Sequence, residues 1–72
     1  MLKIVDARGF SCPQPVLMTL DEIKSGRADK IIVLVDSDAS KENVSRAAEN
    51  RGWKIDSITE EASEYHITLK NG

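Results

Sequence analysis

The stretch Lys30-Ile31-Ile32-Val33-Leu34-Val35-Asp36 decides the fold of this 72-residue chain. Its five consecutive apolar residues, most of them β-branched, are typical of a central strand that has apolar neighbours on both faces. Such a strand needs further strands beside it and helices packed over it, so both are expected in the sequence on either side.

On the N-terminal side, the sequence predicts a short strand over residues 2–6, a turn over residues 8–11 and a helix that opens at residues 12–15. Apolar residues at helical spacing predict the buried stripe of this helix: Val16, Leu17, Leu20 and Ile23. Gly26 is placed to end the helix in a left-handed conformation.

On the C-terminal side, Asp38 is the predicted N-cap of a second helix of about a dozen residues, and Gly52 marks its end. Small apolar residues predict the inward stripe of that helix: Ala39, Val44, Ala47 and Ala48. Residues 53–59 and 65–70 alternate between apolar and polar, which predicts two strands. The acidic residues 60–64 join them, and a hairpin is expected.

This β-α-β-α-β-β order predicts a two-layer α/β (α+β) sandwich with a mixed four-stranded sheet of three parallel strands and an antiparallel last one. Right-handed crossovers place both helices on one face of the sheet. The other face stays open, and part of it is expected to be apolar because residues 31–35 are apolar on both sides. This patch is either a partner surface or is covered by the long stems of Lys54 and Lys70, and both readings stay open here.

Composition and charge limit the functions that the chain can have. Its length predicts one domain over residues 1–72, with a core too thin for a large buried cofactor. Ten Lys plus Arg against twelve Asp plus Glu leave a net charge of −2, which disfavours direct binding to nucleic acid or membrane. With one cysteine, no apparent signal peptide and no long apolar run, we expect a monomeric cytoplasmic protein without cofactor or metal.

The corner Cys12-Pro13-Gln14-Pro15 is the densest feature of the sequence. A thiol at a helix N-terminus has its thiolate stabilised by unpaired amides and by the helix dipole, which lowers its pKa. Pro13 holds the residue before it in an extended conformation, and prolines are tolerated in a first turn because those amides lack partners anyway. The helix could also begin at Pro15, since Pro15 disfavours a helical Gln14.

A lone cysteine is most often a small buried apolar residue, and that reading competes with a chemical role for Cys12. The proline-flanked helix start favours exposure. Dithiol redox chemistry is disfavoured because the chain has no second cysteine, and His66, the one histidine, is expected on the solvent face of the last strand. No Cys/His cluster has metal-ligand spacing. What remains is a thiol that receives a group and hands it on.

The stretch Asp6-Ala7-Arg8-Gly9-Phe10-Ser11-Cys12-Pro13-Gln14-Pro15-Val16-Leu17 resembles the signature of the TusA/SirA/YedF family of small sulfur-carrier proteins, an acidic residue, Arg-Gly and then Cys-Pro-x-Pro. The resemblance covers essentially the whole chain. It implies a fold like that of the C-terminal domain of translation initiation factor 3.

The resemblance also implies a function. Cys12 would accept persulfide sulfur from a cysteine desulfurase and relay it to an acceptor protein, so that the chain is a carrier and not an enzyme. In one branch of the family the sulfur passes towards tRNA thiolation, and other branches serve selenium or other sulfur pathways. The residues that match the signature around the carrier cysteine are expected to support it: Asp6, Arg8, Gly9, Pro13, Gln14 and Pro15.

Some positions depart from the family pattern, namely Phe10, Ala39 and the pair Ser63-Glu64. They weaken an assignment to the tRNA-thiolation branch. The alternative function is a regulatory or binding module that uses the open sheet face, with Cys12 incidental.

Other residues carry expectations of their own. Arg8 either steers an acidic partner or stabilises the Cys12 thiolate, or else it is a solvated turn residue that pairs with Asp6. Gly9 is expected in a turn that needs a positive φ, and Trp53 is expected in the core. Met18 is a candidate for a docking surface. The acidic residues of the hairpin are expected to form a solvated turn: Glu60, Glu61 and Glu64.

Overall fold

The structure of the chain is a computed structural model, and it describes residues 2–10, 14–26 and 28–71. Its elements follow the predicted order: β1 (Leu2–Asp6), α1 (Gln14–Ser25), β2 (Lys30–Val35), α2 (Asp38–Asn50), β3 (Trp53–Glu61) and β4 (Glu64–Asn71). Within these residues, no helix is long and apolar enough to cross a membrane.

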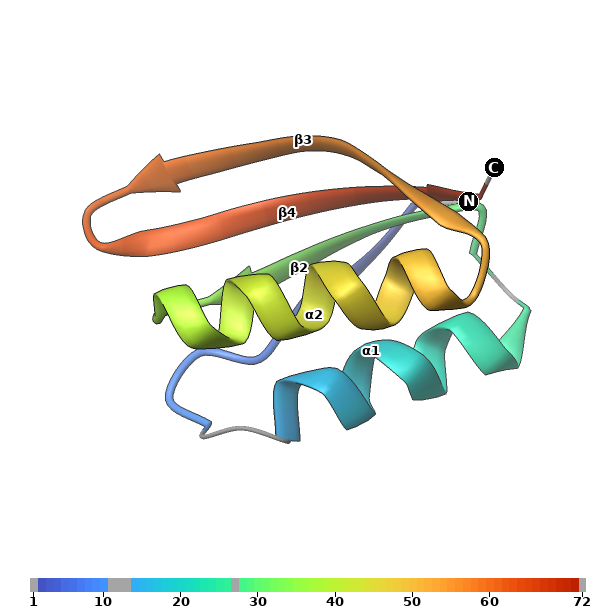
Figure 1. Cartoon of the computed structure of the whole chain (residues 1–72), viewed down its shortest axis with the longest axis horizontal. Helices are drawn as coiled ribbons and strands as arrows, with labels where there is room; N and C mark the ends of the chain where they lie inside the picture. Colours follow the sequence, from blue (N-terminus) through green and yellow to red (C-terminus); the bar gives the residue numbers. More distant parts are fainter. Residues whose placement is uncertain (1, 11–13, 27, 72) are drawn as a thin grey trace.

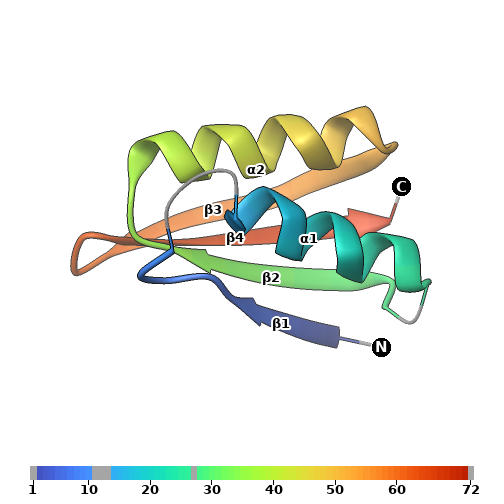
Figure 2. The ribbon, with the colours of Figure 1, turned by 90° about the horizontal axis from the view of Figure 1, so that it is seen from below.

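The four strands form one sheet in the order β1-β2-β4-β3. β1 pairs parallel with β2, and β4 runs antiparallel to both of its neighbours, β2 and β3. Both helices cover the same face of the sheet, and the opposite face is open (Figures 1 and 2). The predicted two-layer sandwich with a mixed sheet and a C-terminal hairpin is therefore confirmed.

The core lies between β2, β4 and the helices. Ile31, Val33 and Val35 of β2 are completely buried, as are Ile67 and Leu69 of β4. Small side chains of α2 let that helix lie close to the sheet, as the sequence predicts. Trp53 closes the core at the start of β3 with 6% exposure, which confirms its predicted place.

The buried face of α1 differs in part from the predicted stripe: Val16 and Ile23 pack against the core as predicted, but Leu17 does not. Pro15 and Thr19 are its buried residues, whereas Leu17 is 49% exposed. The Thr19 hydroxyl donates a hydrogen bond of 2.9 Å to the Pro15 carbonyl, so this polar group is satisfied inside the helix and can be buried. Met18 packs against the core, and the structure does not support its place in a docking surface.

The N-cap of α2 is Ser37 and not Asp38. Ser37 has an extended backbone, and its hydroxyl accepts a hydrogen bond of 3.1 Å from the amide of Ser40. Asp38 is the first helical residue, and its carboxylate lies 3.2 Å from Lys41. Val44 and Ala48 are buried as predicted, and one turn before Val44 the buried residue is Ser40, whereas Ala39 is exposed.

The hairpin turn is shorter than the predicted acidic turn. It consists of Ala62 and Ser63 alone, both with positive φ (52° and 67°), which is a type I′ turn. A β-bulge at Asp56 shifts the register between Ile55 and Ser57. As a result, Ile58 lies on the helix-covered side of the sheet, opposite Ile67.

Candidate functional site

The chain makes a tight turn directly after β1. The amide of Ala7 donates a hydrogen bond of 2.9 Å to the carbonyl of Leu34, and the amide of Phe10 donates one of 3.4 Å to the carbonyl of Ala7. Gly9 has a φ of +84° at the third position, which is a type II turn and requires glycine there. The predicted role of Gly9 is confirmed.

Asp36 holds this turn against the neighbouring strand. The amide of Gly9 donates a hydrogen bond of 2.8 Å to Oδ2 of Asp36, which follows the last residue of β2. Sequence reasoning missed this contact. A signal existed, because the carboxyl ends of neighbouring parallel strands meet at one edge of a sheet, and Asp36 follows a buried strand there.

Arg8 joins β1 to the C-terminal hairpin. Its Nε and Nη2 donate to the two carboxylate oxygens of Asp6 at 2.9 and 2.8 Å, and its Nη1 donates to Oε1 of Glu64 at 3.2 Å. The predicted pairing of Arg8 with Asp6 is confirmed. The prediction that Glu64 belongs to a solvated turn is wrong, because Glu64 begins β4 and accepts from Arg8.

These contacts set the protonation of the group. Hydrogen bonds from the Arg8 side chain and from the Arg8 amide lower the pKa of Asp6 from 3.8 to about 2. The same contact with Asp6, followed by that with Glu64, raises the pKa of Arg8. Asp6 and Arg8 are therefore both charged at neutral pH. The Arg8 side chain is still 42% exposed and accessible to a partner.

Ser11, Cys12 and Pro13 lie outside the described residues, so the expectations for Cys12 and Pro13 remain predictions. The residues on either side are described. Gln14 is the first residue of α1 and is exposed, whereas Pro15 is buried.

The flanks of this segment present two apolar side chains to solvent. Phe10 is 48% exposed before it, and Leu17 is 49% exposed after it. The first turn of α1, residues 14–17, contains no acidic side chain. No carboxylate in that turn therefore offsets the positive end of the helix dipole.

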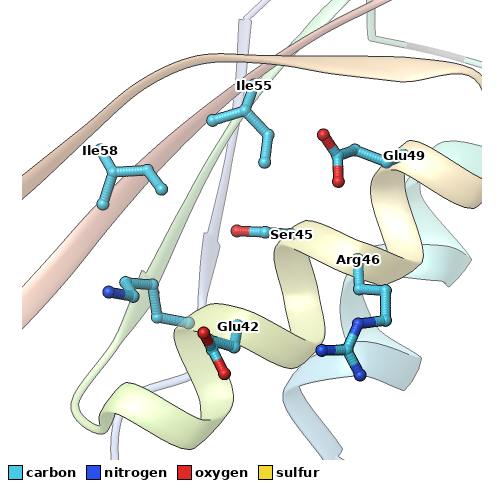
Figure 3. Close-up of a pocket in the computed structure, with 7 residues that line it drawn as sticks. Glu42, Ser45, Arg46, Glu49, Ile55 and Ile58 are labelled. Atoms are coloured by element: carbon cyan, nitrogen blue, oxygen red, sulfur yellow. The ribbon is translucent and has the colours of Figure 1, made fainter.

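A hollow lies between α2 and β3, with a volume of about 350 Å³ (Figure 3). The Ser45 side chain points into it, and its buried Oγ has no hydrogen-bond partner among the described residues. α2 lies between this hollow and α1, so the hollow is separate from the Cys12 flanks (Figure 1). Charged and apolar side chains line it together: Lys41, Glu42, Ser45, Arg46, Glu49, Ile55 and Ile58.

His66 lies on the open face of the sheet and is half-exposed, as predicted. Its Nε2 lies 4.0 Å from Oε1 of Glu64. Among residues 2–10, 14–26 and 28–71, no group of three His, Cys, Asp or Glu side chains is arranged to hold a metal ion.

Comparison with known proteins places this geometry in a family. The model of the family described as sulfurtransferase TusA matches residues 3–71. The chain belongs to the TusA family. Because the match spans β1 to β4, the whole sandwich described above is the TusA-family fold in this chain.

Two relatives extend this result. A protein of Methanocaldococcus jannaschii, named "Putative sulfur carrier protein MJ0990", is 35% identical over 72 residues, covering 96% of this TusA-family chain and 93% of the relative. The crystal structure of a SirA-like protein from Desulfitobacterium hafniense superposes with a TM-score of 0.85 at 28% identity, covering 100% of this chain and 99% of the other. These similarities support a sulfur-carrier or sulfurtransferase-like role.

Proposed function

We propose that this protein is a persulfide carrier whose working atom is the sulfur of Cys12. One observation carries the proposal: the only cysteine of a TusA-family chain stands two residues before the first residue of α1. A thiol near a helix N-terminus has a lowered pKa, and the thiolate is the form that attacks another sulfur.

The transfer step is an exchange at sulfur. The Cys12 thiolate attacks the outer sulfur of a persulfide on a cysteine desulfurase and forms a new S–S bond. The S–S bond of the donor breaks, and the donor cysteine leaves as a thiolate with the bonding electron pair. Cys12 then carries the persulfide, and an acceptor protein takes its outer sulfur in the same way. The chain needs no second catalytic residue, so it is a carrier and not an enzyme.

The described flanks support docking at this end of the molecule. Phe10 and Leu17 offer exposed apolar surface on either side of the segment, and Arg8 offers a half-exposed cation. The turn that leads to Cys12 is held by three sets of contacts: the Ala7 amide on β2, the Gly9 amide on Asp36, and the Arg8 ion pairs. A fixed turn favours transfer because less conformational entropy is lost on docking.

The intact mass of the protein after incubation with a cysteine desulfurase and cysteine, without reductant, tests the proposal. We expect the wild type to gain one sulfur atom that reductant removes, and Cys12→Ala to gain none. A gain on Cys12→Ala, or no gain on the wild type with several desulfurases, would refute the carrier role.

The docking surface has its own matched variants. Leu17→Ser and Phe10→Ser should slow sulfur acceptance, whereas Ile58→Ser, which also replaces an exposed apolar residue but on β3, should leave the rate unchanged. Equal rates in all three variants would place docking elsewhere. The destination of the sulfur, tRNA thiolation or another sulfur or selenium pathway, is tested by offering the loaded protein to purified acceptors of each pathway.

A further inference from the structure

The open face of the sheet carries two rows of like charge that the strand register places at opposite ends. Lys30 of β2, Lys70 of β4 and Lys54 of β3 stand directly opposite one another in one row across three strands. Each alternates with a side chain on the helix-covered face, so all three face the open side. Their row is called here the basic row.

The other end of the same face is acidic. Glu61 of β3 stands opposite Glu64 of β4, and Asp6 of β1 lies near them, joined to Glu64 through Arg8. These three carboxylates are called here the acidic end. With Arg8 the acidic end carries a charge of −2, and the basic row with Asp56, 3.9 Å from Lys30, carries +2. The two ends of the face are balanced.

Such rows are unfavourable in an isolated chain, because like charges directly opposite one another across a ladder repel. Lys54 faces Lys70, and Glu61 faces Glu64. Each row would be relieved by a surface that presents the opposite sign at the same spacing. Apolar side chains also lie on this face between the rows, since Ile32 and Leu34 of β2 are only partly buried there.

We propose that the open face binds the same face of a second copy of this chain about a two-fold axis perpendicular to the strands. Lys54 and Glu61 lie on the same strand, and so do Lys70 and Glu64. This axis stacks β3 on β3 and β4 on β4 in reverse direction, so each Lys54 meets Glu61 of the other copy and each Lys70 meets its Glu64. In β2, Ile32 of each copy meets Leu34 of the other.

The other simple stacking does not fit. A two-fold axis parallel to the strands would put the basic row over the basic row and the apolar edge strand β1 over the polar strand β3. The perpendicular axis joins opposite charges on β3 and β4 and apolar side chains on β2, whereas on β1 it places Ile4 of each copy opposite Asp6 of the other. The proposed dimer thus differs from the monomer expected from the sequence.

The size of the face predicts a weak dimer. The face is four strands wide, with about 4.8 Å per strand, and the charged rows are six residues apart, with about 3.3 Å per residue. Its projected area is therefore about 400 Å² per copy, without the additional surface of protruding side chains. The total of about 800 Å² is below the area of stable specific interfaces and in the range of weak, transient ones. We expect a dissociation constant between about 10 μM and 1 mM that rises with ionic strength.

A charge swap on one strand tests the proposal by sedimentation equilibrium in the presence of reductant, which excludes disulfide-linked dimers. Lys54→Glu alone and Glu61→Lys alone should each weaken self-association at least tenfold, because each places like charges in contact twice. An equimolar mixture of the two variants should form a heterodimer within about threefold of the wild-type affinity, since the swap restores both pairs.

Lys3→Glu is the matched control. Lys3 of β1 points to the same side of the sheet as Val5, away from the open face, so its exposed charge should not affect association. A wild type that stays monomeric up to about 1 mM would overturn the proposal. So would self-association that survives both single variants, or a mixture that fails to associate.

Discussion

Two guanidinium nitrogens of Arg8 donate hydrogen bonds of 2.8 and 2.9 Å to the carboxylate of Asp6, and the Arg8 amide donates one of 3.2 Å to the same carboxylate. The two residues are separated by a single alanine. This local contact fixes the direction of the chain as it leaves β1, and it joins the turn to the hairpin through Glu64.

The contact makes stability depend on acid. The folded pKa of Asp6, about 2, lies below its ordinary value of 3.8, so its contribution is present above pH 3.8 and is lost as the pH falls through about 2. Asp6→Asn should lower the melting temperature at pH 7 by no more than about 5 °C, because the pair is exposed. This difference should shrink between pH 4 and pH 2. Thermal denaturation measures it, with Asp21→Asn as the control for loss of one negative charge; a difference unchanged at pH 2 would contradict the assignment.

Gly9 and Gly52 form a matched pair for the role of the turn. Both have a φ of +84°, and an added Cβ would meet no atom within 4 Å at either position. Each Gly→Ala variant should therefore lose about 1 kcal/mol of stability from backbone conformation alone. Only Gly9→Ala should also slow sulfur acceptance, because Gly9 anchors the turn before Cys12. Equal transfer rates in the two variants would argue against a role for the turn.

Ile67 and Ile58 stand opposite each other in β4 and β3, but only Ile67 is completely buried; Ile58 is 43% exposed. Ile67→Val should cost about 1 kcal/mol, because the lost methylene leaves a void in a close-packed core. Ile58→Val should cost no more than about 0.5 kcal/mol. Urea denaturation compares the two, and similar losses would contradict the exposed position of Ile58.

The turn of the hairpin can be improved. Ala62 and Ser63 both adopt a left-handed conformation that favours asparagine and glycine. Combining Ala62→Asn with Ser63→Gly should raise the free energy of unfolding by about 1 kcal/mol, because the strain of two side chains at positive φ is removed. The single variants should each give part of this gain. An unchanged midpoint of urea denaturation would mean that the two residues are not in a type I′ turn.

The sequence by itself determined the order of the elements and the class of fold. Hydrophobic patterns are local, so the β-branched apolar run of residues 31–35 and the period-2 alternation of residues 53–59 and 65–70 could be identified as strands without knowing their neighbours. The left-handed end of α1 at Gly26 and the turn at Gly9 were also readable, because few other residues adopt positive φ. The Cys-Pro-x-Pro stretch indicated the family that the comparisons then showed.

Only the tertiary structure decided which side chains meet. The contacts of Asp36 with Gly9 and of Arg8 with Glu64 join residues 27 and 56 positions apart, and strand alignment sets them. The buried side of α1 follows from how the helix lies beside α2, so Thr19 replaced Leu17. The charged rows of the open face depend on the register of three strands, which one bulge at Asp56 adjusts. Periodicity shows which face a residue takes within its own element, but only pairing and packing decide what stands opposite it.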